Sequence, residues 1–248
     1  MQLVYIIVMI VALIGMVVCQ KKQNSFAAAK PLALILMLVV AVCGVMVLSS
    51  MFGDPHQDIR NNENYFYSTQ SYMAGKTIKD RGITGKVVML LDENYKQDPR
   101  TEQIVEMMKK GLGHDNVVFD TIVLPDAETA MDPLYMRMRS KDFDAVIDKY
   151  ADAAIVVTYV ALPLDFLKNS KYKNAKTPKF AFVNIAESPL LRRLLPSGQV
   201  EFVVTISNKA VFNEDPAPAD PEQAFNIRYA IVDKNNYAEY KDSIGIGF

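Results

Sequence analysis

The stretch from Lys86 to Leu124 reads KVVMLLDENYKQDPRTEQIVEMMKKGLGHDNVVFDTIVL, and it decides the fold. Residues 86–91 form a short, continuous apolar run, and residues 117–124 form a second one. Between them, apolar residues recur at helical spacing over 101–112. A buried strand, a helix and a second buried strand in this order predict a right-handed βαβ unit with parallel strands.

The same alternation continues toward the end of the chain. Further strands are predicted at 154–160, 179–185, 201–207 and 226–232, helices at 140–150 and 188–195, and a last turn at 237–240. Continuous apolar strands separated by helices are typical of a parallel sheet that is covered on both faces. We therefore predict a three-layer αβα domain over 84–248, with a mostly parallel sheet of five or six strands. The Pro- and acid-rich segment 213–222 predicts an exposed loop, before a last strand that is antiparallel or at the edge.

The first 53 residues have a different character from the rest of the chain. They contain no Asp or Glu, and the runs 3–19 and 31–51 carry no charge at all. A helix rises about 1.5 Å per residue and a hydrocarbon core is about 30 Å thick, so the second run spans it comfortably and the first marginally. These runs predict a two-helix transmembrane hairpin over 1–53. A juxtamembrane linker and helix follow over 54–83, with the helix itself expected at 65–80 and closed by Gly82.

Charge predicts how this hairpin is oriented. Lys21, Lys22 and Lys30 lie at the ends of the loop between the two runs and are the only charged residues of the hairpin. Positive loops stay on the cytoplasmic side. We expect a protein of the cell membrane with two spans and an extracytoplasmic C-terminal domain, and the opposite orientation is the alternative.

Composition excludes several classes of function. The remaining 24 basic and 28 acidic residues all lie in 54–248, which therefore carries a net charge of −4. A mildly acidic domain without a basic stripe argues against nucleic acid as a partner. Both cysteines, Cys19 and Cys43, lie in the apolar runs or at their ends, so the α/β domain has no disulfide and no thiolate metal site.

Motifs for catalysis and cofactors are missing from the sequence. Asp92, Glu93 and Asn94 stand where a dinucleotide-binding strand would be followed by glycines, and neither GxSxG nor HExxH occurs. The only histidines are His56, in the linker, and His114, at a helix exit. We expect no cofactor, no metal and no enzymatic activity; a hydrolase that uses His114 ranks last among the functions considered.

Open α/β sheets bind ligands beyond the carboxyl ends of their strands. The polar side chains expected there are the candidate ligand-binding residues: Asp92, Glu93, Asn94, Tyr159, Asn184, Glu187, Ser188 and Ser207. The alternative is that they cap helices and turns, as Ser188 before Pro189 would do at a helix start.

The segments KVVMLLDENYKQDPRTEQIVEMMKKGL, VVFDTIVL and FDAVIDKYADAAIVVTYVALP resemble one lobe of the type I periplasmic-binding-protein and receptor ligand-binding family. The resemblance covers 85–207 and implies the same αβα fold. Proteins of that family close two lobes on a ligand, whereas 84–248 suffices for one lobe only.

Two functions follow as expectations. The first is a membrane-anchored interaction or scaffold module, whose partners are membrane lipid and either another envelope protein or a second copy of the chain. The alternative is a small-molecule sensor or transport accessory domain, as the family resemblance implies.

Overall fold

The computed structural model describes residues 2–21, 28–52, 57–124, 134–174, 178–183 and 190–240. The chain divides into two compact units, Met1–Arg60 and Asn61–Phe248, and each is described by itself. The division falls inside helix α3 (Gln57–Asp80), which starts in the first unit and contributes most of its length to the second.

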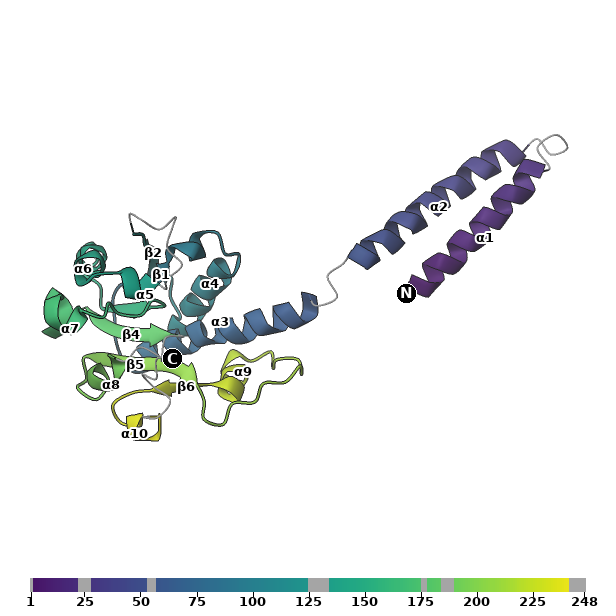
Figure 1. Ribbon diagram of the computed structural model, residues 1–248. Helices are drawn as coiled ribbons and strands as arrows, with labels where there is room; N and C mark the ends of the chain where they lie inside the picture. The colour runs from purple at the N-terminus through teal and green to yellow at the C-terminus, as the bar shows by residue number, and fades with distance from the viewer. Residues whose placement is uncertain are drawn as a thin grey trace. The chain divides into compact units, whose positions relative to one another are not determined.

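The first unit contains two apolar helices, α1 (Gln2–Lys21) and α2 (Ala29–Phe52), which lie side by side in Figure 1. A Cβ added at Gly15 would lie 3.0 Å from the side chain of Leu36, so this side chain of α2 packs directly against the Gly15 backbone. Among the described residues, the Ala29–Val47 part of α2 is long and apolar enough to cross a membrane, by length and composition. The apolar part of α1, Tyr5–Lys21, is shorter.

The second unit is built on a six-stranded sheet with the strand order β2-β1-β3-β4-β5-β6. The first five strands are mutually parallel, and β6 is antiparallel to β5 at the edge. The strands are β1 (Val87–Asp92), β2 (Val117–Ile122), β3 (Ile155–Thr158), β4 (Lys179–Val183), β5 (Val200–Ile206) and β6 (Tyr229–Val232). The prediction of a mostly parallel sheet of five or six strands is confirmed: the sheet has six strands, and the last one is antiparallel.

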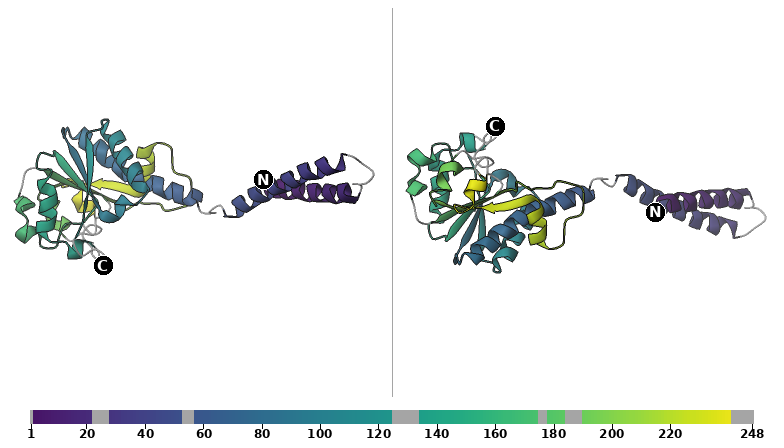
Figure 2. Two further views of the ribbon diagram at one scale, coloured as in Figure 1. Left: turned by 90° about the horizontal axis from the view of Figure 1, so that it is seen from above. Right: turned by 90° about the horizontal axis from the view of Figure 1, so that it is seen from below.

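Helices cover both faces of this sheet (Figures 1 and 2). One face packs against α3, α4 (Arg100–Leu112) and α9 (Pro221–Arg228), and the other against α6 (Ser140–Asp148), α7 (Phe166–Asn169) and α8 (Leu191–Leu194). The short elements are η1 (Glu93–Lys96), α5 (Leu134–Arg137), η3 (Lys171–Asn174) and α10 (Tyr237–Tyr240). The arrangement is the predicted αβα sandwich.

Alternate strand residues enter two separate cores. Val88 and Leu90 of β1 join the core beneath α6, whereas Met89 and Leu91 join the core beneath α3 and α4. All four are fully buried. Because the sheet has two buried faces, its strands read in the sequence as continuous apolar runs.

Helix α3 begins at Gln57, eight residues before the helix predicted from residue 65. Most residues of its first two turns are exposed and polar, so the apolar spacing that signals a helix starts only later. Gly82, with a φ of 66°, closes the helix in the left-handed conformation, as predicted.

Helices α3 and α4 cross with their backbones in direct contact. A Cβ added at Gly75 would overlap the carbonyl oxygen of Met108, and one added at Gly111 would overlap the carbonyl oxygen of Tyr72. Both overlaps are closer than 3.0 Å, and both meet backbone that no side-chain rotation can move away. These two glycines therefore fix the distance between the helices.

A second predicted boundary, near the end of the chain, is also wrong. The expected strand at 226–232 begins only at Tyr229, because residues 226–228 end helix α9. The Asp220 carboxylate accepts a hydrogen bond from the Gln223 N–H (2.8 Å), and Pro221 occupies the first helical position. This pairing of an N-cap Asp with an N1 proline is a helix-start signal in the predicted loop 213–222.

The segment 207–220, named the strap, connects β5 to α9 and lies against the first half of α3. The Asn62 side chain donates to the Asp215 carbonyl (3.0 Å) and accepts from the Ala217 N–H (2.7 Å). The Tyr65 hydroxyl donates to the Ala219 carbonyl (2.8 Å). The strap is thus held to α3 through its backbone groups.

Arg228 locks the strap and α3 together. Its guanidinium donates to both carboxylate oxygens of Glu63, at 2.6 and 2.8 Å, and to the Asn213 carbonyl at 3.3 Å. It lies 3.6 Å from the ring centre of Phe66 and 5.1 Å from that of Phe212. Arg228 is only 1% exposed, so this cation depends on these partners for the solvation it has lost.

Candidate functional site

The order of the strands changes direction between β1 and β3. The chain leaves β1 toward β2 on one side of the sheet and leaves β3 toward β4 on the other. In open α/β sheets the crevice outside the carboxyl ends of two such strands is where ligands bind. Asp92 ends β1, and Tyr159 directly follows β3 with its N–H donating to the Leu90 carbonyl (2.8 Å). The structure therefore brings these two predicted residues to neighbouring strand ends.

The turn after β1 presents polar groups at this edge. The Asp92 carboxylate accepts a hydrogen bond from the Asn94 N–H (2.9 Å) and so caps η1. Glu93 is partly exposed and lies 3.9 Å from the Lys96 amine, whereas Asn94 is exposed. Asp92 thus has the capping role that was the alternative, while Glu93 and Asn94 keep side-chain groups available to a ligand.

Tyr159 is buried behind this turn. Its hydroxyl shares a hydrogen bond of 2.5 Å with the Ser71 hydroxyl of α3, and its ring meets Tyr95 edge-on with 6.3 Å between centroids. Burial raises the pKa of the Tyr159 phenol well above its ordinary value, so it stays neutral and hydrogen-bonding across the physiological range.

A second hydroxyl pair lies beside the first. Tyr95 of η1 and Tyr67 of α3 share a hydrogen bond of 2.7 Å between their hydroxyls. The Arg100 guanidinium stacks over the Tyr67 ring at 5.7 Å and donates to the Asp98 carboxylate. The side-chain hydrogen bond from Arg100 holds the pKa of Asp98 below its ordinary value.

Sequence reasoning missed Tyr67, Ser71 and Tyr95 as parts of this site. Tyr67 and Ser71 come from a helix that precedes the sheet and was expected to be a juxtamembrane element. Their contacts join residues that are 28 and 88 positions apart, which no local pattern reveals. The aromatic spacing in α3 was the available signal, and it indicates burial rather than a site.

Of the other predicted site residues, the structure describes only Ser207, which is not part of this cluster. Ser207 lies after β5, separated from β3 by β4. Its N–H donates to the Arg228 carbonyl (2.9 Å) and its hydroxyl accepts from the Lys209 N–H (3.2 Å), so it forms a turn. Asn184, Glu187 and Ser188 lie outside the described residues.

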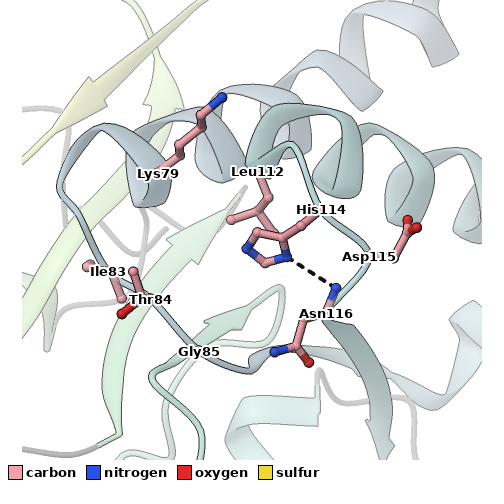
Figure 3. A pocket seen from close by; sticks show the side chains of 8 residues that line it. All are labelled: Lys79, Ile83, Thr84, Gly85, Leu112, His114, Asp115 and Asn116. Carbon is pink, nitrogen blue, oxygen red and sulfur yellow. Dashed lines mark hydrogen bonds between the residues drawn. The ribbon is translucent and has the colours of Figure 1, made fainter.

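An open hollow of about 550 Å³ lies at the opposite end of the sheet, where the parallel strands begin, here called the amino edge (Figure 3). It is lined by Lys79, Ile83, Thr84, Gly85, Leu112, His114, Asp115 and Asn116. Figure 3 shows the His114 ring in the middle of the hollow, where its Nδ1 accepts the Asn116 N–H (3.2 Å).

The basic groups of the hollow have a structural explanation. Lys79 lies in the last turn of α3, and His114 follows the end of α4. Helix C-termini carry partial negative charge, which cationic side chains offset. His114 is exposed and its Nδ1 is occupied within a turn, which disfavours the hydrolase hypothesis. The hollow thus lies where the parallel strands begin, whereas the phenols and carboxylates described above lie at the opposite end, the carboxyl edge, where the strands finish.

The carboxyl-edge cluster offers hydrogen bonds and aromatic surface rather than an activated nucleophile. Within the parts of the chain that the structure describes, no three His, Cys, Asp or Glu side chains are placed to hold a metal ion. Phenols, a carboxylate and an amide can recognise a ligand by hydrogen bonding and stacking.

The comparisons with known proteins give a likeness of fold only. No protein-family model and no curated protein matches the chain. Among solved structures, the chain is similar to a LacI transcriptional regulator from Bacteroides fragilis, described as putative (13% identity, TM-score 0.43, 70% of this chain and 61% of that one). It is also similar to the arabinose-binding protein AraP from Geobacillus stearothermophilus (13% identity, TM-score 0.44, 71% and 63%). Both have type I periplasmic-binding-protein-like folds, the fold that the sequence resembles. The chain spans less than two thirds of either.

Proposed function

We propose that residues 61–240 form a small-molecule recognition domain, tethered by the apolar helix α2, that binds its ligand at the carboxyl ends of β1 and β3. The observation that carries this proposal is the coincidence of two features. The strand order changes direction between β1 and β3, and the Tyr95–Tyr159 aromatic pair and the polar turn of η1 converge at that same place.

The side chains at the carboxyl ends of β1 and β3 favour one chemical class of ligand over others. Glu93 and Asn94 offer a carboxylate and an amide at the rim, and the Tyr95 ring offers an aromatic surface with a hydroxyl at its end. Hydrogen-bond acceptors outnumber cationic groups at this rim, which favours a polar ligand with hydroxyl or amino donors over a polyanion.

A ligand screen by thermal unfolding tests this proposal. The full chain, in mild detergent, is heated with a panel of small polar metabolites. A ligand at about one hundred times its Kd is expected to stabilise the domain by about 2.7 kcal/mol, and Glu93→Gln and Asn94→Ala should reduce that gain. Glu102→Gln, on the exposed surface of α4, is the matched control and should keep it. A panel that shifts no unfolding midpoint counts against the proposal, as does a gain that survives both site variants.

A protein-interaction module is the second candidate, and exposed apolar side chains favour it. Val123 directly follows β2, Ile206 ends β5, Leu164 lies in the segment between β3 and α7, and Met136 lies in α5; each is at least 50% exposed. Exposed apolar side chains favour a protein partner, either another membrane protein or a second copy of this chain. The preparation used for the ligand screen separates the two candidates, because mass spectrometry of what co-purifies shows either a stoichiometric protein or a small molecule.

We propose further that α1 and α2 form a membrane hairpin with the α/β domain on the extracytoplasmic side. The length and composition of α2 support a span, and Lys21, Lys22 and Lys30 support a cytoplasmic loop. The α/β domain contains no native cysteine, so in a chain with Cys19→Ala and Cys43→Ala a single new thiol reports its own location. A membrane-impermeant maleimide should label Glu102→Cys in intact cells and should fail to label Gln23→Cys. The reverse pattern would establish the opposite orientation.

A further inference from the structure

Helix α3 connects the candidate site to the part of the chain that leads to the membrane helices. Its residues Tyr67 and Ser71 bond to Tyr95 and Tyr159 at the carboxyl edge of the sheet. Its first residue, Gln57, is separated from the end of α2 by residues 53–56 only. We propose that α3 is a lever that transmits occupancy of the carboxyl-edge site toward the membrane hairpin, an inference that rests on the proposed function of that site.

The glycine crossing supplies the pivot of this lever. At Gly75 and Gly111 the backbones of α3 and α4 touch without an intervening side chain, so α3 cannot translate toward α4. It can rotate about the point of contact. Interiors are close-packed and respond to a displaced group by shifting whole elements rather than by compressing.

The geometry of the helix amplifies movement. With a rise of about 1.5 Å per residue, Ser71 lies about 6 Å from the pivot at Gly75 and Gln57 lies about 27 Å from it. A rigid rotation that moves Ser71 by about 1 Å therefore moves Gln57 by about 4 Å. A ligand that pushes on Tyr95 or Tyr159 needs only a small displacement to move the start of the helix.

A rotation of α3 must displace the strap and the Arg228–Glu63 ion pair. The strap contacts α3 through Asn62 and Tyr65, both on the far side of Ser71 from the pivot, whereas Glu63 is held by Arg228 at the end of α9. Outside the helix start at Asp220 the strap has no regular secondary structure, so it can follow the helix, whereas the Arg228–Glu63 bonds join α3 directly to α9 and must shift with it or break. The hydroxyl pairs at Tyr67 and Ser71 and the strap contacts at Asn62 and Tyr65 thus hold α3 at two separate places. A rotation of α3 moves both places together.

Hydrogen–deuterium exchange of the full chain in detergent tests the lever without a ligand. Tyr159→Phe removes one hydroxyl and releases Ser71, and Tyr67→Phe releases Tyr95. Each variant is expected to raise exchange severalfold in residues 57–66, which include none of the four hydroxyl residues. Tyr172→Phe is the matched control, because it removes a hydroxyl that bonds Asp148 on the other face of the sheet (2.7 Å). It should leave 57–66 unchanged.

Exchange in β4 distinguishes a lever from general loosening. A variant that merely destabilises the domain raises exchange in β4 and in 57–66 together, and that result overturns the proposal. A change confined to the turns around Ser71 and Tyr159 also overturns it. The outcome is independent of the ligand screen: a screen without hits removes the proposed function, whereas unaltered exchange in 57–66 removes the lever and leaves the binding site in place.

Discussion

Replacing Gly111 with alanine is expected to lower the free energy of unfolding of the α/β domain by about 3 kcal/mol, at the upper end of the cost of overpacking a core. The added methyl group would overlap the backbone carbonyl of Tyr72, and the Lys76 backbone nitrogen lies next to it. Because helix backbones cannot rotate away as side chains do, α3 and α4 must separate and lose their packing against β1. Gly75→Ala, which meets the Met108 carbonyl, should behave in the same way.

The measurement is thermal unfolding followed by circular dichroism. For a domain of this size, about 3 kcal/mol corresponds to a midpoint lowered by about 6–12 °C. Glu106→Ala is the control, since it is an exposed position of α4 with equal or better helix propensity after substitution. A Gly111→Ala protein that unfolds at the wild-type temperature would show that the two helices do not cross as described.

Replacing Glu63 with glutamine is expected to cost about 2–3 kcal/mol, the second largest effect. The substitution keeps the shape of the side chain but leaves Arg228, at 1% exposure, without its counter-charge. Loss of one partner of a buried pair costs about 3–5 kcal/mol, and the 50% exposure of Glu63 reduces this because water reaches the pair.

A double-mutant cycle separates the ion pair from packing. Adding Arg228→Met to Glu63→Gln removes the stranded cation and places an apolar side chain between Phe66 and Phe212, so the double variant should be more stable than Glu63→Gln alone. Additive losses would indicate that the charge pairing carries no energy. Glu93→Gln breaks only the distant, exposed contact with Lys96 and serves as the control, with an expected change below about 1 kcal/mol.

The pair also predicts how stability depends on pH. The hydrogen bond from Arg228 holds the pKa of Glu63 below its ordinary value of 4.5. A depressed pKa in the folded state means that this contribution is complete above about pH 4.5 and is lost as the pH falls through the lower, folded-state value. Unfolding midpoints measured from about pH 6 to about pH 3 should therefore converge for wild type and Glu63→Gln at the acid end.

The strands and their connections were predictable because both faces of the sheet are buried. Strands β1, β3, β4 and β5 appear in the sequence as apolar runs, and helical spacing between them leaves one topology class. The edge strand β2 was also recognised by its apolar residues, although Val118 and Phe119 are exposed. The end of the chain was less predictable. A helix start at Asp220 and Pro221 lies within a segment whose Pro- and acid-rich composition is that of a loop, so the capping signal does not stand out.

The candidate site was predictable only in part. The carboxyl-edge rule places Asp92 and Tyr159 together, because it depends on strand order and strand ends, which the sequence indicates. It does not place Tyr67 or Ser71, because the position of α3 is set by long-range packing at Gly75 and Gly111. The burial of Arg228 could not be predicted for the same reason, because its partner Glu63 precedes it by 165 residues.

The measurement that tests the central proposal most directly is a hydrogen-exchange footprint of the first ligand that raises the unfolding midpoint. Protection concentrated in residues 92–96 and 158–162 is the expected result, since it places the ligand at the carboxyl ends of β1 and β3. Protection concentrated in residues 79–85 and 112–116 would place the ligand in the hollow around His114, at the other edge of the sheet, and would contradict the proposed site.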